Sequence, residues 1–414
     1  MEYTLMHQNI SVAHIEIDEE TGSISKIIEI YYQEHMPVGT VCTIHNEIKI
    51  QRAALNHWWT GRSIPASRNG IRKALEEIDM YDTTLLLTRC LGLSLSDHYW
   101  IKPFGSNMKW EDVNFFTNSF SEDIGNVLFG APKKEVGFDY SSPDNTSDGD
   151  LRKRWKIING KRCLVKEGTN PYCQQPFNEV IAVKIMERLG IVNVPYTIMW
   201  ENSQPYSVCE DFVTPETELV SAWRMVQLRP KANHENVYMH FVNICVESGV
   251  PDIIASLDRM IVLDYIIANE DRHMNNFGLL RNAQTLEWIG FAPIFDSGTS
   301  LGYNTATQNL LVYEPICKPF KKSHYEQLSL VSDYSWIDFA SLDGIEDEIH
   351  ELLLGENVEK YIDEQRRNAI ITGISERIEN LKKIAKTHLQ KNFNSLENDV
   401  LEDIATEYSG ETEL

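Results

Sequence analysis

The sequence predicts an α+β protein in which strand-rich segments come first and a mainly helical half follows. Two pairs of strand patterns, each joined by a turn, lie between residues 152 and 213. After residue 216 the apolar spacing becomes helical, and a stretch over 253–268 that is apolar almost all round indicates a buried central helix. At 414 residues, the chain is long enough for two or three units with cores of their own.

A shift in composition to Gly, Pro, Asp and Ser around residues 130–143 marks a connector between units. We expect an accessory domain over residues 1–127, an antiparallel-sheet unit over 128–215 and a helical unit over 216–390. Residues 391–414 are acidic and poor in apolar side chains, which predicts a loosely ordered, flexible tail.

The overall charge and the cysteines narrow the classes of function. A formal net charge of −23 argues against a sequence-independent grip on nucleic acid or on an anionic membrane. Seven scattered cysteines without a Cys-x-x-Cys pair argue against a structural zinc site or a disulfide framework, so we expect free thiols in a reducing compartment. The first residues do not resemble a signal peptide and no apolar run could span a bilayer, so we expect a cytoplasmic protein.

The first 127 residues carry signals of fold but no chemistry that the sequence reveals. Alternating apolar residues over 11–32 predict a hairpin, a further strand pattern covers 40–50, and residues 53–78 are helical with a break at Pro65.

Residues 91–120 are rich in aromatic side chains. They could form a platform on which bases stack, but too few basic residues lie between them, so core packing is the favoured interpretation. The aromatic residues are Tyr99, Trp100, Phe104, Trp110, Phe115, Phe116 and Phe120.

A polar loop precedes the first strand pair of the sheet unit. The strands over 152–158 and 162–166 are joined at Asn159-Gly160, which predicts a type I′ hairpin. A loop of small residues ahead of such strands, here residues 141–150, can cover phosphates with backbone N–H groups. It lacks a Gly-x-Gly-x-x-Gly pattern, so an ordinary surface turn is the alternative. The candidate phosphate-binding residues are Ser147, Asp148 and Gly149.

Lys166 ends the second of these strands and is followed by a helix that carries Glu179 near its start. A strand lysine held by a glutamate from the next helix is the arrangement with which kinases bind the α- and β-phosphates of ATP. A lysine that faces solvent is the alternative interpretation for Lys166. Further along, Glu210 and Phe212 lie where the second strand pair ends, either as a hinge that reads an adenine edge or as an ordinary strand exit.

The most specific signal follows the buried helix, in the segment Asn269 to Gly278. Asp271 and Asn276 have the spacing of the base and the metal-holding amide in the catalytic loops of kinases, and Asp296 supplies a second carboxylate downstream. Arg272 is expected to neutralise the carboxylates of the site or to reach phosphate. His273 could act as a base, but a structural histidine that bonds to the loop backbone is the favoured interpretation.

These residues resemble the HipA-like serine/threonine kinases, including their CtkA-like relatives, over roughly residues 139 to 385. The front segment, before about Leu128, shows no clear match to the N-terminal unit of HipA toxins. The residues that carry the resemblance are Lys166, Glu179, Asn269-x-Asp271-Arg272-His273-x-x-Asn276-Phe277-Gly278 and Ala292-Pro293-x-x-Asp296.

The resemblance implies a two-lobed, protein-kinase-like fold, with residues 128–215 as the antiparallel-sheet N-lobe, 216–390 as the helical C-lobe and an extra N-terminal α/β segment. It implies transfer of phosphate from ATP, with Mg²⁺, to a Ser or Thr of a protein. It also implies the role of toxin in a toxin–antitoxin pair and an antitoxin or regulatory protein as partner. By position, Asp271 would be the base, Asn276 and Asp296 the metal ligands, and Lys166 the phosphate-binding cation.

Family members can phosphorylate a serine of their own nucleotide loop and so switch themselves off. The candidates in this chain are Ser147 first, and then Thr146, Ser142 and Ser141. Lys318, Lys321 and Lys322 form a small basic cluster in the segment where kinases carry an activation loop, or else a solvated surface. Two other functions remain open from the sequence: a kinase for a lipid or small molecule, similar to the phosphatidylinositol kinases, and a nucleotide-binding pseudokinase.

Overall fold

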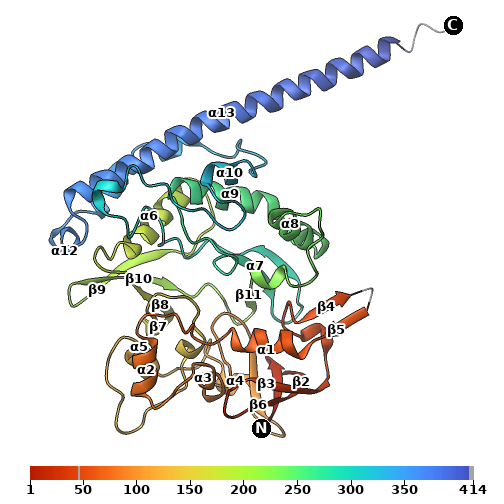
Figure 1. Ribbon diagram of the computed structural model, residues 1–414, viewed down its shortest axis with the longest axis vertical. Helices are drawn as coiled ribbons and strands as arrows, with labels where there is room; N and C mark the ends of the chain where they lie inside the picture. Colours follow the sequence, from red (N-terminus) through yellow and green to blue (C-terminus); the bar gives the residue numbers. More distant parts are fainter. Residues whose placement is uncertain (45–46, 410–414) are drawn as a thin grey trace.

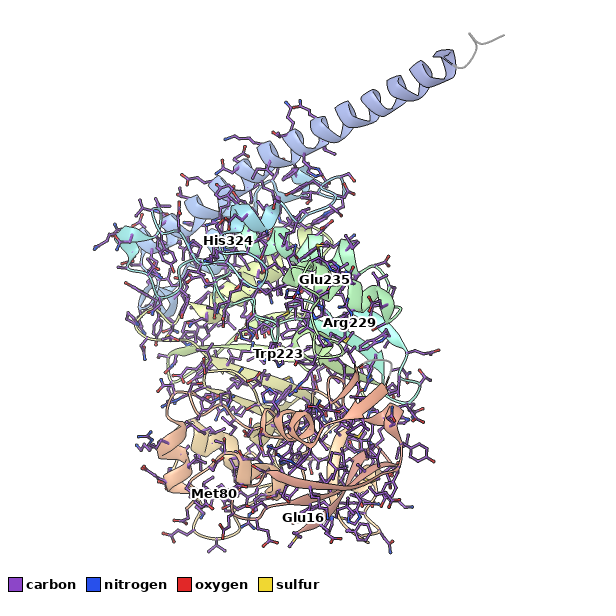
Figure 2. The ribbon with its side chains drawn as sticks, turned by 45° about the vertical axis from the view of Figure 1, so that its right-hand side comes forward. Glu16, Met80, Trp223, Arg229, Glu235 and His324 are labelled. Carbon is purple, nitrogen blue, oxygen red and sulfur yellow. The ribbon has the colours of Figure 1, made fainter. Side chains whose placement is uncertain are left out.

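The computed structural model describes residues 1–44 and 47–409, with the side chains of 42–49 and 391–409 left aside. The elements stack in layers: the front segment lies at one end, a four-stranded sheet lies in the middle, and helices fill the other end (Figure 1). Trp223 lies between Glu16 and Met80 of the front segment on one side and His324 of the helical half on the other (Figure 2).

The front segment is built on an antiparallel sheet with the strand order β3-β2-β1-β6. The predicted hairpin over residues 11–32 is present as β2 and β3. The pattern over 40–50 forms a separate two-stranded hairpin rather than one strand, and its turn at residues 45–46 lies outside the described residues. The strands are β1 Glu2–His7, β2 Ile10–Ile17, β3 Ile24–Ile30, β4 Val41–Ile44, β5 Glu47–Ile50 and β6 Tyr99–Pro103.

Short helices connect these strands and lead to the next sheet. The predicted helical stretch is broken at Pro65, as expected, into α1 and α2. The helices are α1 Arg52–Thr60, α2 Ile71–Glu77, α3 Thr84–Arg89, α4 Trp110–Val113 and α5 Asp123–Leu128, with 3-10 turns η1 Gln33–His35 and η2 Pro143–Thr146.

The aromatic residues of 91–120 pack mainly in the core, as predicted. Trp100 and Phe115 are fully buried, and Tyr99, Trp110 and Phe116 are nearly so. Phe104 differs: it is 52% exposed, and it stacks on the ring of His14 with a centroid distance of 3.8 Å. Its position after β6, in the turn that leaves the sheet, explains the exposure.

A second antiparallel sheet, with the order β7-β8-β10-β9, forms the middle layer. Asn159 and Gly160 have φ values of 51° and 80°, the left-handed conformation that a type I′ turn requires. Helix α6 packs on β9 and β10, and Pro176 in its first turn matches the fixed φ of proline. The elements are β7 Lys153–Ile158, β8 Lys161–Glu167, α6 Gln175–Arg188, β9 Tyr196–Glu201 and β10 Gln204–Glu210.

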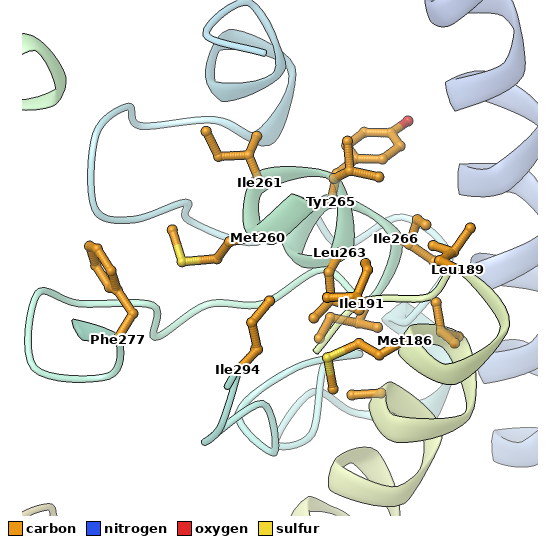
Figure 3. Packing of buried hydrophobic residues seen from close by; sticks show 14 of the residues in the cluster. Met186, Leu189, Ile191, Met260, Ile261, Leu263, Tyr265, Ile266, Phe277 and Ile294 are labelled. Carbon is orange, nitrogen blue, oxygen red and sulfur yellow. The ribbon is translucent and has the colours of Figure 1, made fainter. Parts of the chain in front are cut away.

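The chain then enters the helical layer through a small sheet, β11-β12-β13. Within this layer α9 is buried almost all round, as its sequence predicts, and it packs with Met186 and Leu189 of α6 (Figure 3). The elements are β11 Thr217–Ser221, α7 Ala222–Met225, α8 Val237–Glu247, α9 Ile253–Ile266, β12 Gly278–Asn282 and β13 Trp288–Phe291.

The C-terminal helices cover α9, and the last of them projects far beyond the body (Figure 1). The backbone of residues 391–409 continues α13, and the chain has no glycine or proline between Gly373 and Gly410 to end the helix. The flexibility of this tail stays a prediction. Residues 410–414 lie outside the described residues. These elements are η3 Thr307–Asn309, α10 His324–Leu328, η4 Phe339–Leu342, α11 Ile345–Leu352, α12 Glu356–Glu359 and α13 Glu364–Ser409.

Two further expectations concern cysteines and membranes. The six cysteines among the described side chains are free and buried, as expected; Cys42 lies outside that set. Of the helices that the structure describes, none combines the length and the apolar character needed to cross a bilayer.

Replacing Ile261 of α9 by alanine is expected to lower the free energy of unfolding by about 2–5 kcal/mol, because the side chain is 1% exposed and its removal leaves a cavity. Ile254 on the same helix is 42% exposed, so Ile254→Ala should cost below about 1 kcal/mol. Urea unfolding followed by circular dichroism measures both. Equal costs for the two variants would contradict the placement of α9 at the centre of the core.

Candidate active site

Three charged side chains from separate elements meet at the junction of the middle sheet and the helical layer. Lys166 of β8 donates to Asp296 Oδ1 at 2.7 Å and to Glu179 Oε1 of α6 at 3.3 Å. It also lies 3.2 Å from the hydroxyl of Tyr196. Lys166 and Glu179 are buried, while the side chain of Asp296 keeps 27% exposure. The sequence prediction that Lys166 faces a cleft, and not open solvent, is therefore confirmed.

Lys166 and Asp296 hold each other in their ionised forms. Burial opposes the ammonium form of Lys166, but Asp296, Tyr196 and Glu179 raise its pKa well above its ordinary value. Burial likewise opposes the carboxylate of Asp296, but Lys166 and Lys153 lower its pKa below the usual range. Burial raises the pKa of Glu179, and Lys166 offsets part of that rise. The cluster therefore presents a fixed cation beside a fixed carboxylate.

A second lysine lies in the same cavity, and sequence analysis missed it. Lys153 of β7 is the direct cross-strand partner of Lys166 and is 8% exposed. Burial and, after it, the charge of Lys166 lower its pKa to about 8, while Asp296 opposes that change. The signal was present in the sequence: a two-residue turn at Asn159-Gly160 pairs 158 with 161, and counting back along both strands pairs Lys153 with Lys166.

The predicted phosphate-binding loop borders this cavity. Ser147, Asp148 and Gly149 line it together with Lys153 and Lys166. Gly149 has a φ of +91°, and a Cβ at this position would lie 2.6 Å from the Nζ of Lys153. The left-handed backbone conformation favours glycine here, and a larger residue would also displace the end of the Lys153 side chain.

The four candidate phosphorylation sites differ in accessibility. Ser147 is buried and its hydroxyl donates to Asp144 O at 2.8 Å. Ser142 is fully buried with its hydroxyl on Asp144 Oδ2, Thr146 donates to Leu93 O at 2.9 Å, and Ser141 is exposed. Phosphorylation of Ser147 would thus require the loop to leave its present position.

The loop after α9 brings Asn276 to the lining of the cavity, while Asp271 lies outside that lining. Asn276 lines the cavity, and its Nδ2 donates to Asp271 O at 2.8 Å, which leaves Oδ1 as the atom available to a metal ion. Asp271 N donates to Asn269 Oδ1 at 2.9 Å. The carboxylate of Asp271 is 37% exposed and accepts from Lys318 Nζ at 2.8 Å. Lys318 of the predicted basic cluster is thus bonded to the predicted base and is not merely a solvated surface residue.

Among the described contacts Arg272 forms no ion pair with Asp271 or Asp296, but its charge helps to lower the pKa of Asp296, in line with the expected neutralisation. Its guanidinium is fully buried and forms an ion pair with Asp264 of α9 at 3.0 Å. It also donates to Phe295 O at 2.5 Å and to Ser297 Oγ at 2.9 Å. Arg272 therefore fastens the motif loop to α9 and to the segment that carries Asp296, which makes it a positioning residue.

His273 has the structural role that the sequence favoured. Its Nδ1 accepts from Asn275 N at 3.2 Å, so it bonds to the loop backbone. Its Nε2 lies 3.9 Å from Asp271 Oδ2, beyond hydrogen-bond distance.

Glu210 and Phe212 both line the cavity at the exit of β10. The carboxylate of Glu210 pairs with Lys161 at 2.6 Å on the surface. Phe212 stacks on Phe295 with a centroid distance of 5.4 Å. Asp211, between them, also lines the cavity, and the role of this exit in reading an adenine edge stays a prediction.

The donor set suits Mg²⁺ held jointly with phosphates. Among the described residues, no three His, Cys, Asp or Glu side chains gather in a way that could hold a metal ion by themselves. Asn276 and Asp296 offer one amide and one carboxylate oxygen, and Mg²⁺ ordinarily takes one or two such ligands plus phosphate oxygens and water.

Comparisons with known proteins bear on the family and the fold of the chain. Residues 144–373 match the model of the HipA-like C-terminal domain family. The serine/threonine-protein kinase CtkA of Helicobacter pylori is 27% identical over 146 residues, which make up 31% of this chain and 42% of CtkA. The matched segment therefore spans less than half the length of that curated relative.

Two solved structures are similar to the chain. The proinflammatory kinase CtkA of Helicobacter pylori covers 58% of this chain and 94% of its own at 20% identity, with a TM-score of 0.44. HipA in the complex of HipA, HipB and operator DNA from Shewanella oneidensis MR-1 covers 93% of this chain and 99% of its own at 11% identity, with a TM-score of 0.50.

Because the similarity to the HipA structure covers 93% of the chain, it includes most of the front segment. The front segment therefore matches in fold, although its sequence shows no clear match. The predicted α+β, kinase-like fold with an extra N-terminal segment is confirmed. Because its family model covers more than half of the chain, this protein belongs to the family that carries a HipA-like C-terminal domain.

Proposed function

We propose that this chain is a serine/threonine protein kinase that transfers the γ-phosphate of ATP to a protein hydroxyl, with Mg²⁺. The observation that carries the proposal is Lys166, buried between Glu179 and Asp296 at 3.3 and 2.7 Å. The two carboxylates keep this buried ammonium group charged and fixed in position beside the cavity, as a group that binds phosphate must be. The two neighbouring ammonium groups, Lys153 and Lys166, fit a polyphosphate.

The residues around the cavity divide between phosphates, metal and base. Lys166 and Lys153 would bind phosphate oxygens, and Asn276 Oδ1 with Asp296 would hold Mg²⁺, which neutralises the charge of the phosphates when bound. Leu164, Val194 and Leu219 line the apolar part of the cavity, which suits an adenine ring.

Asp271 is the proposed base. Its carboxylate is 37% exposed, so a hydroxyl on another protein can reach it. The carboxylate of Asp271 would accept the proton of the hydroxyl group as the hydroxyl oxygen attacks phosphorus. Lys318, whose Nζ lies 2.8 Å from Oδ1 of Asp271, orients this carboxylate. Its neighbours Asn269 and Asn276 hold its backbone from both sides, which fixes the position of the carboxylate.

The partners and the regulation of the enzyme are also proposals. The similar HipA structure is a complex with HipB and operator DNA, which supports an antitoxin or regulatory protein as partner and a role as a toxin. Autophosphorylation is proposed at Ser147 first, then at Thr146, Ser142 or Ser141. The buried hydroxyl of Ser147 implies that phosphorylation there would displace the loop and reduce nucleotide binding.

Asp271→Asn should lower incorporation of phosphate from labelled Mg-ATP by about 10²–10⁴-fold, because it removes the base. Its stabilisation by Mg-ATP in thermal unfolding should remain, since the nucleotide-binding residues are intact. Asp347→Asn, at an exposed acid on α11, is the matched control and should keep full activity. Mass spectrometry of phosphosites with an added protein mixture reads out transfer to self and to other proteins. Undiminished phosphorylation by Asp271→Asn would remove Asp271 from the role of base.

Affinity for Mg-ATP should fall as the pH rises above about 8. Burial has lowered the pKa of Lys153 to about 8, so its positive charge is lost above that pH in the free protein. Binding of an anion must then restore the proton, which weakens binding by up to about tenfold per pH unit. Lys153→Arg stays charged and should flatten this dependence, while Lys156→Arg, on the same strand, should not. Calorimetric titration with Mg-ATP at pH 7–9 measures the affinity of the native protein and of both variants. An affinity of the native protein that does not change with pH would contradict the role of Lys153 in binding phosphate.

A further inference from the structure

The nucleotide loop is held in place by one arginine of the front segment, a part of the chain to which no role has been assigned. Arg68 lies between α1 and α2 and is 2% exposed. Its guanidinium donates to Ser147 O at 2.6 Å, to Ser147 Oγ at 2.9 Å and to Gly149 O at 2.9 Å. All three acceptors belong to the loop that borders the proposed phosphate site.

The residues on either side of Arg68 hold the same loop. Ser67 donates from its hydroxyl to Asp150 Oδ1 at 2.5 Å, and Asn69 N donates to Asp150 O at 3.4 Å. Thr146, at the other end of the loop, donates to Leu93 O of the front segment. The front segment therefore contacts the loop along its whole length, with Arg68 in the centre.

The bonds of Arg68 orient the peptide groups of the loop. In a trans peptide the N–H points opposite to the C=O, so carbonyls of Ser147 and Gly149 that face Arg68 turn the N–H groups of Asp148 and Asp150 away from it. Within the described part of the chain, neither of these N–H groups has a hydrogen-bond partner. Asp148 lines the cavity, and a free N–H of this kind beside a cavity can donate to a phosphate; Gly149 N, between the two, donates instead to Asp148 Oδ1 at 2.7 Å.

Arg68 is buried, and its hydrogen-bond partners are available only when the loop has its present conformation. Burial lowers the pKa of Arg68 to about 10, although Asp144, Asp148 and Asp150 oppose that change. In the described residues no carboxylate lies within ion-pair distance of its guanidinium. The loop carbonyls and the Ser147 hydroxyl are therefore its principal partners, and a loop that moved away would leave a buried cation without them.

We infer that Arg68 is a positioning residue for nucleotide binding, which fixes the loop with the N–H of Asp148 free for the phosphates of the nucleotide. The inference rests on the proposed function, and it gives the front segment a part in phosphate binding. Arg68 itself would contact neither the nucleotide nor the protein that accepts the phosphate, because its guanidinium is bonded to the side of the loop that faces away from the cavity.

Arg68→Ala should weaken binding of Mg-ATP by at least about tenfold, because only a fraction of the molecules then hold the loop in the binding conformation. Adenosine has no phosphates, so its affinity should stay within about twofold of the native value. Arg72→Ala, at an exposed arginine four residues later, is the matched control and should change neither affinity. Calorimetric titration of each variant with Mg-ATP and with adenosine gives the comparison.

The outcomes separate the inference from the proposed function. If Arg68→Ala loses affinity equally for Mg-ATP and adenosine, the defect is a general structural one. If neither affinity changes, the loop does not need Arg68 to hold its binding conformation. Either result overturns the inference. A native protein that binds adenosine but not Mg-ATP would overturn the proposed function first. Amide hydrogen exchange of residues 146–150, without nucleotide, must also be faster in Arg68→Ala than in the native protein. If Arg68→Ala does not fold, Arg68→Lys, which keeps the charge but cannot make all three bonds, takes its place.

Discussion

The ion cluster of Lys166, Glu179 and Asp296 is the interaction on which the rest of the structure depends. Its three members come from β8, α6 and the segment after β13, so it forms only when the middle sheet and the helical layer are joined. Buried charges are costly when unpaired, and here each is satisfied by the others. Ser297 N donates to the second oxygen of Glu179 at 2.8 Å, so the backbone that carries Asp296 is tied to the same helix. The geometry of the cavity is therefore a consequence of folding, and it does not have to be assembled when a ligand arrives.

A second set of buried hydrogen bonds and ion pairs supports the loop that carries Asp271, the proposed base. Arg272 and Asp264 fasten the motif loop to α9, which lies in the largest hydrophobic cluster of the described residues. Asn269 and Asn276 then hold the backbone of Asp271 from both sides. The only member of this group with a carboxylate open to solvent is Asp271. Rigid, buried partners around one exposed acid are what a transfer reaction to a bulky protein acceptor requires.

Much of the fold and of the site could be predicted from the sequence, for physical reasons that differ from residue to residue. The hairpin at Asn159-Gly160 and the buried helix α9 follow from turn chemistry and apolar spacing, which are local. The meeting of Lys166 with Glu179 followed from their order along the chain. The ion pair of Arg272 with Asp264 was missed because Asp264 lies on the buried side of a helix, where the sequence shows only an acid in an apolar stretch. Arg68 was invisible because 79 residues separate it from Ser147, and no local pattern reports such a contact. The helix over 391–409 was missed because acidic composition was given more weight than the absence of glycine and proline.

The central claim is that Lys166 and Lys153 face the phosphates of a bound nucleotide. An acyl-phosphate derivative of ATP, which transfers its acyl group to a lysine beside the phosphates, tests this on the native protein. Peptide mass spectrometry should find the label on Lys166 or Lys153, and excess ATP should suppress it. Label confined to lysines outside the cavity, or label on these two that ATP does not suppress, would contradict the claim.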